Sequence, residues 1–368
     1  MGGIEQSYSP FRPLDKPKRM RTHHNLRILL IVAVCCTVLL VRRTGISQTP
    51  NSHGLLPTKA IVSPRDQAAN STLGFEKILT VAYKQNNWRT RGLRAAASIT
   101  NLNIDVPEQP YITDEEVNDF LAHSSEPHRN EKGTARVWMA HRDMLKHIIM
   151  SSFSTALILE DDADWDMNIH IQSALLSSAI RNLTDTKADD NSPYGSEWEV
   201  LWLGHSGDQS FNTATPHVEY ADPTILPFKT YAWWTKAFLE QYNRAGHRSV
   251  QWPIEPTGLI AYAVNTGVAQ KILRHLGEGG HQAIDLELRY LCQYHILRCF
   301  IVNPEIVGMY EPKAELGYVS PNNEGNGQTL SKVDEAFEKV KGATRNVKDS
   351  ARCAALFGST CQPTVSEA

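Results

Sequence analysis

The stretch Ala156-Leu-Ile-Leu-Glu160-Asp161-Asp162-Ala163-Asp164-Trp165-Asp166 decides how this chain is interpreted. Four apolar residues run directly into five carboxylates, with no turn residue between them. A short apolar run of this kind is typical of a buried strand. Grouped carboxylates repel one another unless a cation or hydrogen-bond donors neutralise them. The stretch therefore predicts a central strand whose carboxyl end carries an acidic cluster.

Further apolar runs lie on both sides of this stretch, and segments with helical spacing separate them. The predicted strands are Ile78–Tyr83, Ala156–Leu159, Val200–Leu203, Leu259–Val264 and Cys299–Val302. The predicted helices are 137–148, 171–183, 269–276 and 284–297. This alternation predicts an α/β fold, with a Rossmann-like, mainly parallel sheet and helices on both faces. Such sheets bind ligands at the carboxyl ends of their strands, where the acidic cluster lies.

Three interpretations of the acidic cluster compete. The first is a solvated acidic turn that caps the next helix. The second is a calcium loop, because Asp162-x-Asp164-x-Asp166 imitates the start of an EF-hand, but Met167 and Ser173 stand where that loop has Gly and Glu. We favour the third, a catalytic divalent-metal site, because carboxylate oxygens are the ligands that Mg²⁺ and Mn²⁺ prefer.

Several motifs together resemble glycosyltransferase family 25, which includes bacterial lipopolysaccharide-modifying transferases, collagen galactosyltransferases and fungal type II membrane proteins. The Leu-Glu-Asp-Asp order of the acidic stretch is the most specific of them. The others are Thr134–His141 with Leu145, Val200–Gly207, Gly258–Val264 with Gly267–Leu273, and Ala283–Glu287. The resemblance covers residues 76–320, which we take as the catalytic domain.

The resemblance implies a GT-A-like fold and a metal-dependent hexosyltransferase. Such an enzyme moves galactose or glucose from a UDP-sugar to a hydroxyl of a glycan or glycoprotein acceptor, with inversion. It implies Mn²⁺, or Mg²⁺, on Asp161 and Asp162, with Asp164 as a third ligand. Glu160 would orient the nucleotide ribose or a ligating water. The metal would neutralise charge on the leaving diphosphate.

Other candidate residues complete the predicted site. The general base would be Asp285, with Glu287 as the second choice, although Asp285 can equally cap the helix that starts beside it. Arg89 and Arg91 would hold the diphosphate or uracil, or else lie on a solvated surface. His205, between two glycine residues after a strand, is a candidate for substrate contact.

Departures from the family pattern support a second function. Arg136-Val-Trp-Met-Ala140-His141 stands where the family has Gly-Cys-x-x-Ser-His, and Ala82-Tyr83-Lys84 stands where it has an Asn-Leu pair. The alternative is a non-catalytic lumenal relative that binds nucleotide or glycan without turnover. His141 itself lies on the apolar face of its predicted helix, where a core residue is more frequent than a ligand.

The first 75 residues predict that the protein is anchored in a membrane. A basic tail, 1–27, precedes the uncharged run 28–41 (ILLIVAVCCTVLLV), which we interpret as a signal-anchor transmembrane helix. A cleaved signal peptide and a buried helix are the alternatives, but Arg42-Arg43 occupies the place where a cleavage site needs small residues. The basic tail predicts a cytosolic N-terminus and a lumenal body, in a single-pass type II protein of the Golgi or ER. Residues 42–75 are typical of a polar stem.

The body of the chain has an acidic balance and an even set of cysteines. Residues 44–368 carry 29 basic and 38 acidic side chains, which argues against a nucleic-acid partner. Cys292–Cys299 and Cys353–Cys361 are the simplest of the three ways to pair the four cysteines there. Residues 321–368 predict a polar loop and a charged helix, with no functional assignment.

Overall fold

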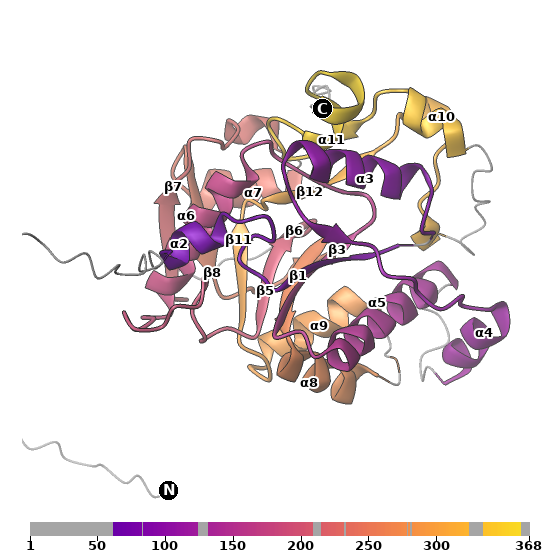
Figure 1. Ribbon diagram of the computed structural model, residues 1–368, viewed down its shortest axis with the longest axis horizontal. Coiled ribbons are helices and arrows are strands. Elements are labelled where there is room, and N and C mark those ends of the chain that lie inside the picture. The colour runs from indigo at the N-terminus through magenta and orange to yellow at the C-terminus, as the bar shows by residue number, and fades with distance from the viewer. Residues whose placement is uncertain are drawn as a thin grey trace, which may run out of the picture. The chain divides into compact units, whose positions relative to one another are not determined.

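The central sheet of the computed structural model has eight strands, in the order β2-β1-β3-β10-β5-β11-β8-β7 (Figure 1). Their bounds are β1 Lys77–Val81, β2 Ile104–Asp105, β3 Thr155–Glu160, β5 Val200–Gly204, β7 His217–Ala221, β8 His247–Gln251, β10 Ala261–Asn265 and β11 Cys299–Asn303. All five strands predicted from apolar runs are present, as β1, β3, β5, β10 and β11.

The sheet is mostly parallel. Six of its strands point the same way, while β8 and β10 run opposite to their neighbours. The predicted parallel character is therefore confirmed in the main, and the two reversed strands are an addition to it. Strand β3 lies between β1 and β10, so its apolar residues are covered on both edges by hydrogen-bonded neighbours.

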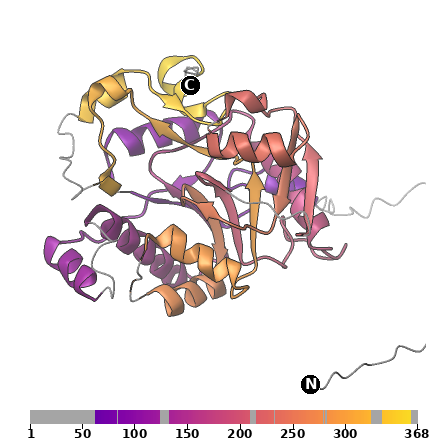
Figure 2. The same ribbon diagram turned by 180° about the vertical axis from the view of Figure 1, so that it is seen from behind.

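Helices cover both faces of the sheet, as predicted. They are α2 Pro64–Ala68, α3 Trp88–Ile99, α4 Asp114–Ala122, α5 Lys132–Ser151, α6 Ile169–Leu183, α7 Trp233–Tyr242, α8 Thr266–Leu276, α9 Ile284–Gln293, α10 Asp334–Lys339 and α11 Ala351–Phe357. Short 3₁₀ turns occupy η1 Phe228–Thr230, η2 Ala314–Leu316 and η3 Pro321–Asn323. Figure 1 shows α5, α8 and α9 together on one side of the sheet, with α3 and α11 on the other, and Figure 2 shows the same layers from behind.

The two faces have separate hydrophobic cores because side chains alternate along each strand. Within β3, Leu157 and Leu159 pack in the core that includes α3 and α6, whereas Ile158 packs with α5, α8 and α9. Trp138 of α5 and Trp202 of β5 are fully buried in that second core. A strand buried on both faces needs a continuous apolar run, which is what the sequence shows at 156–159.

Two smaller sheets extend the body. One joins β4 Ala163–Trp165, β12 Val307–Glu311 and β13 Ala343–Thr344 in the order β13-β12-β4, and the other pairs β6 Gly207–Asp208 with β9 Pro256–Thr257. Of the three ways to pair the four cysteines, the simplest, Cys292–Cys299 with Cys353–Cys361, is the one formed.

Structured residues extend beyond the expected catalytic-domain limits of 76 and 320. Before residue 76, Ala68, Leu73 and Phe75 belong to the core next to α6, so the end of the expected stem is part of the body. After residue 320, β13 and α11 pack against β12 and α3. Burial of apolar side chains at both ends explains why these limits do not delimit the folded unit.

The structure describes residues 62–82, 84–123, 132–208, 215–231, 233–277, 279, 282–323 and 334–361. The predicted basic tail at 1–27 and anchor at 28–41 lie outside these residues. Within the described ranges, none of the helices combines the length and the apolar character needed to span a bilayer.

Candidate active site

A cleft of about 620 Å³ opens where β1 and β3 end. Val81 pairs with Glu160 in the parallel register of these two strands, so the residues that follow both of them enter the cleft side by side. The rest of the wall comes from segment 109–112, the first half of α5, residues 258–260, the first turn of α9 and residues 320–322. The acidic cluster therefore lies at the edge of the sheet where the sequence predicts a ligand site.

Arg89 binds both carboxylates at the centre of this cleft. Its Nε lies 2.5 Å from Oδ1 of Asp161 and its Nη2 lies 2.6 Å from Oδ2 of Asp162. All three side chains are nearly buried. Arg89 stands in the first turn of α3, where a capping box between Asn87 and Thr90 starts the helix. The cap thus fixes the position from which the guanidinium reaches the acidic pair.

Negative charge is in excess at this point. Glu160, Asp161 and Asp162 are consecutive, and Arg89 is the cation that directly contacts the latter two. Oδ1 of Asp162 is buried and has no hydrogen-bond partner among the residues that the structure describes. Burial raises the pKa of Asp162 to about 7; Arg89 opposes this rise, while Glu160 and Asp161 add to it. At Asp162 the attraction of Arg89 therefore does not offset the effect of burial.

Asp164 faces the other way, into the protein. Its Oδ1 accepts hydrogen bonds from the backbone N–H groups of Trp165 and Arg352, each at 2.9 Å. Its Oδ2 accepts from the hydroxyl of Thr344 at 2.6 Å and from the hydroxyl of Ser350. The side chain is fully buried and is not part of the cleft wall. The structure therefore does not place Asp164, the expected third metal ligand, with Asp161 and Asp162.

Asp285 lies in the cleft wall, in the first turn of α9. Its Oδ2 accepts a hydrogen bond from the backbone N–H of Gly258 at 2.7 Å, which fixes the carboxylate. Gly258 has a φ of +81°, and a Cβ there would lie 2.7 Å from Oγ of Ser206. Ala283 is the N-cap residue of α9, so the helix-capping alternative for Asp285 is not what its side chain does here.

Three other expected site residues lie away from the cleft. Arg91 pairs with Glu338 of α10 at 2.7 Å and so joins α3 to the C-terminal region. His205 is buried, with Nε2 donating to the carbonyl of Val302 at 2.9 Å and Nδ1 accepting from the N–H of Gly207. Glu287 is half-buried on α9 and does not line the cleft. The side chains of all three residues therefore lie outside the cleft wall.

Tyr318 and His141 also contact the charged groups of the site. The hydroxyl of Tyr318 accepts a hydrogen bond from Nη1 of Arg89 at 2.5 Å, so all three guanidinium nitrogens have a partner. His141 is buried, as expected for a core residue, yet it also lines the cleft, with Nε2 3.5 Å from Oε1 of Glu160 and Nδ1 hydrogen-bonded to the hydroxyl of Tyr262. A lone tyrosine in a loop gives no sequence signal for its role, whereas His141 ends a motif of the family resemblance and is expected to be either a core residue or a ligand.

The donor set can be compared with what a metal ion requires. In the ranges that the structure describes, no three His, Cys, Asp or Glu side chains come together as a metal site. Two neighbouring carboxylates with excess negative charge, one of them Asp162 with an oxygen that has no partner in the described ranges, nevertheless fit a cation that keeps waters and takes its other ligands from phosphate, as Mg²⁺ does. Asp161 and Asp162 are the residues that would hold it.

Comparison with known proteins does not name a family. No family model and no curated protein matches this chain. Among solved structures, it is similar to a mannose-1-phosphate geranyltransferase from Thermus thermophilus, at 11% sequence identity and a TM-score of 0.22, covering 61% of this chain and 73% of that chain. A match this weak carries no argument, so the function has to be argued from the cleft itself.

Proposed function

We propose that this chain is a metal-dependent glycosyltransferase that moves a hexose from a UDP-sugar to a hydroxyl of a glycan or glycoprotein. The observation that carries the proposal is the pair Asp161 and Asp162, set with excess negative charge where β3 ends in a large cleft. The cleft volume of about 620 Å³ is in the range of small-molecule sites. The resemblance of the Leu-Glu-Asp-Asp stretch to family 25 supports the same reaction class.

The proposed roles on the donor side follow from position. Asp161 and Asp162 hold the cation, Mn²⁺ or Mg²⁺, which when bound supplies Lewis-acid neutralisation of diphosphate charge. Arg89 already lies at these carboxylates, and its guanidinium suits phosphate oxygens. Glu160 is partly exposed in the cleft and orients the nucleotide ribose or a water.

Asp285 is the proposed base on the acceptor side. It takes the proton of the acceptor hydroxyl while that oxygen bonds to the anomeric carbon and the bond from this carbon to the diphosphate breaks. The hydrogen bond from Gly258 holds the carboxylate in one orientation, which a general base requires. Asp164, Glu287, Arg91 and His205 receive no role in the reaction, because they lie outside the cleft wall.

One observation favours the second candidate, a relative that binds nucleotide or glycan without turnover. Arg89 already neutralises part of the charge on both carboxylates, so the acidic pair has an internal counter-ion without any metal. In that case the cleft still binds a ligand, but metal is not required for binding and no sugar is transferred.

The proposed location is the Golgi or ER membrane, with residues 28–41 as anchor and the body in the lumen. Two disulfides in the described body support this, since disulfides persist in oxidising compartments and are rare in the cytosol. Selective protease digestion of sealed microsomes tests it: a protected body agrees with the proposal, and a digested body contradicts it.

Release of UDP from UDP-galactose and UDP-glucose tests the activity. We expect release in Mn²⁺, none after chelation, and a loss of at least about 100-fold in Asp285→Asn, in keeping with general-base contributions. Glu287→Gln is the matched control, because it lies on the same helix but outside the cleft, and it should retain activity. Metal-independent nucleotide binding without release would favour the second candidate.

A further inference from the structure

The acidic cluster is divided between two surroundings. Asp161 and Asp162 face Arg89 and the cleft, whereas Asp164 and Asp166 face the C-terminal segment 343–361. Asp166 accepts a hydrogen bond from the N–H of Asp349 at 2.9 Å, and Met167 donates to the carbonyl of Asp349 at 2.8 Å. Residues 161–166 therefore form one wall of the cleft and also bind a segment that lies about 180 residues later in the chain.

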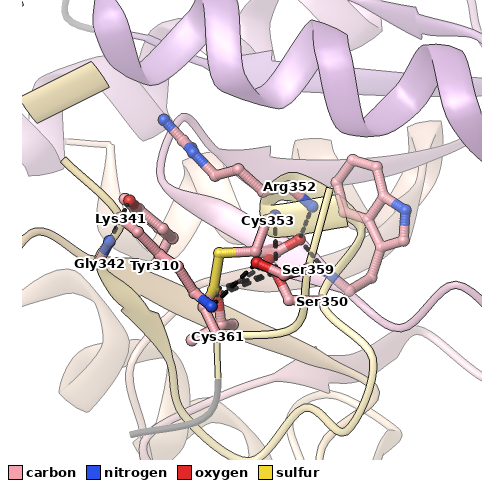
Figure 3. Close-up of a disulfide and its surroundings, with 11 residues drawn as sticks. Tyr310, Lys341, Gly342, Ser350, Arg352, Cys353, Ser359 and Cys361 are labelled. Carbon is pink, nitrogen blue, oxygen red and sulfur yellow. Dashed lines mark hydrogen bonds between the residues drawn. A yellow bond between two sulfur atoms is a disulfide. The ribbon is translucent and has the colours of Figure 1, made fainter. Parts of the chain in front are cut away.

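The Cys353–Cys361 disulfide lies beside Ser350 (Figure 3), one of the two residues whose hydroxyl groups hold Asp164. The hydroxyl of the other, Thr344, lies 3.8 Å from Sγ of Cys361. Ser350 donates to Asp164 and accepts from the N–H of Cys353 at 3.0 Å, and its hydroxyl oxygen lies 3.5 Å from the disulfide sulfur of Cys361. The N–H of Thr344 donates to the carbonyl of Cys361 at 3.0 Å. Both hydroxyl-bearing residues are thus tied to the loop that the disulfide closes.

The same segment also reaches the helix that carries Arg89. Nη2 of Arg352 donates to the carbonyl of Trp88 at 2.9 Å, and its guanidinium lies over the rings of Trp88 and Tyr310. Tyr310 in turn donates its N–H to the carbonyl of Asp162 at 2.9 Å. The C-terminal segment therefore reaches both partners of the ion pair indirectly, through Trp88 beside Arg89 and through Tyr310, which bonds to Asp162.

We propose that the disulfide-closed C-terminal segment positions the acidic loop, with Ser350 as the main positioning residue and Asp164 as its anchor in the loop. The segment holds Asp161 and Asp162 in place for the ligand, and this part of the inference rests on the proposed function. The segment is part of the binding site's construction, and loss of the Cys353–Cys361 bond loosens the loop that faces the cleft.

Hydrogen–deuterium exchange of the full chain, read on peptides covering 161–166, tests this without any ligand. We expect exchange at least about tenfold faster in Ser350→Ala and in the double variant Cys353→Ala/Cys361→Ala. The matched controls are Ser177→Ala, which removes another buried serine hydroxyl that donates to the carbonyl of Pro193, and Cys292→Ala/Cys299→Ala. The two disulfides close loops of similar separation, 8 and 7 residues, so the chain-entropy model assigns them similar global effects.

Faster exchange at 161–166 in the first two variants and not in the controls supports positioning. Equal exchange in all four variants would overturn it, and Ser350→Ala decides alone if the cysteine variant is not secreted. The second readout is affinity for UDP with Mn²⁺, which should fall at least about tenfold in Ser350→Ala and stay unchanged in Ser177→Ala. If the wild type binds no nucleotide, the proposed function fails, while the exchange result still decides this inference.

Discussion

Replacing Arg89 by methionine removes the counter-ion of the acidic pair while keeping an apolar stem of similar length. The arginine is 8% exposed and pairs with two nearly buried carboxylates, at 2.5 and 2.6 Å. Removing one partner of a buried pair typically costs about 3–5 kcal/mol, because the remaining charge is left unpaired. Arg91→Met is the matched control on the same helix, and its half-exposed pair with Glu338 should be worth at most about 1 kcal/mol.

The cost of Arg89→Met should also depend on pH, with a sign that follows from Asp162. The folded-state pKa of Asp162, about 7, is raised above its ordinary value of 3.8, so its contribution favours folding below pH 4 and is lost as pH rises through 7. Without Arg89 the folded-state pKa rises further. The variant therefore loses additional stability above pH 7, by up to about 1.4 kcal/mol per pH unit relative to wild type.

Urea unfolding of the full-length chain, followed by tryptophan fluorescence at pH 6 and pH 9, measures both effects. The expected result is a large loss for Arg89→Met that grows between these two pH values, with little change for Arg91→Met. A cost for Arg89→Met no greater than that for Arg91→Met, at either pH, would refute the buried ion pair as described.

Three further predictions concern the same body. Mn²⁺ alone should raise the unfolding midpoint of Arg89→Met more than that of the wild type, because the variant has lost its internal cation; an equal response in calorimetry would contradict this. Gly258→Ala should lower the free energy of unfolding by about 1–3 kcal/mol in urea titration, since Gly258 has a φ of +81° and the new methyl meets Ser206. Arg248→Met should cost about 3–5 kcal/mol at pH 7 by leaving buried Asp222 unpaired. Burial raises the pKa of Asp222, but Arg248 and Thr224 lower the pKa by more, so on balance it lies below its ordinary value. The ion pair therefore stabilises the fold above pH 4, and the stability lost in Arg248→Met should be smaller at pH 3 than at pH 7.

The sequence predicted the strands whose burial leaves an apolar run. Strands β3 and β5 are buried on both faces and consist largely of consecutive apolar residues, so their pattern was readable. Strand β8, HRSVQ, was missed because it buries polar residues: Arg248 pairs with Asp222, and Ser249 bonds to Gln251. Helix α3 was missed because its buried face consists mainly of small and polar residues, with Trp88 and Leu93 as its large apolar side chains, and because its start depends on the capping box at Asn87.

The candidate site was predictable as a cluster but not in its division of roles. The acidic stretch indicated the edge of the sheet and the two carboxylates that face the cleft. The sequence could not show that Asp164 turns inward, because its partners Thr344 and Ser350 are 180 and 186 residues away. In the same way, the partnership of Arg89 with Asp161 spans 72 residues and depends on how α3 packs beside β4.

Thermal unfolding of the full-length chain with UDP, with and without Mn²⁺, tests the central claim most directly. A ligand at about 100 times its dissociation constant adds roughly 2.7 kcal/mol of stability. The account predicts that UDP raises the midpoint only when Mn²⁺ is present, and that Asp162→Asn abolishes the rise while Asp189→Asn, at an exposed position, retains it. A well-folded wild type whose midpoint is unchanged by UDP with Mn²⁺ would contradict a metal-dependent nucleotide-sugar site at Asp161 and Asp162.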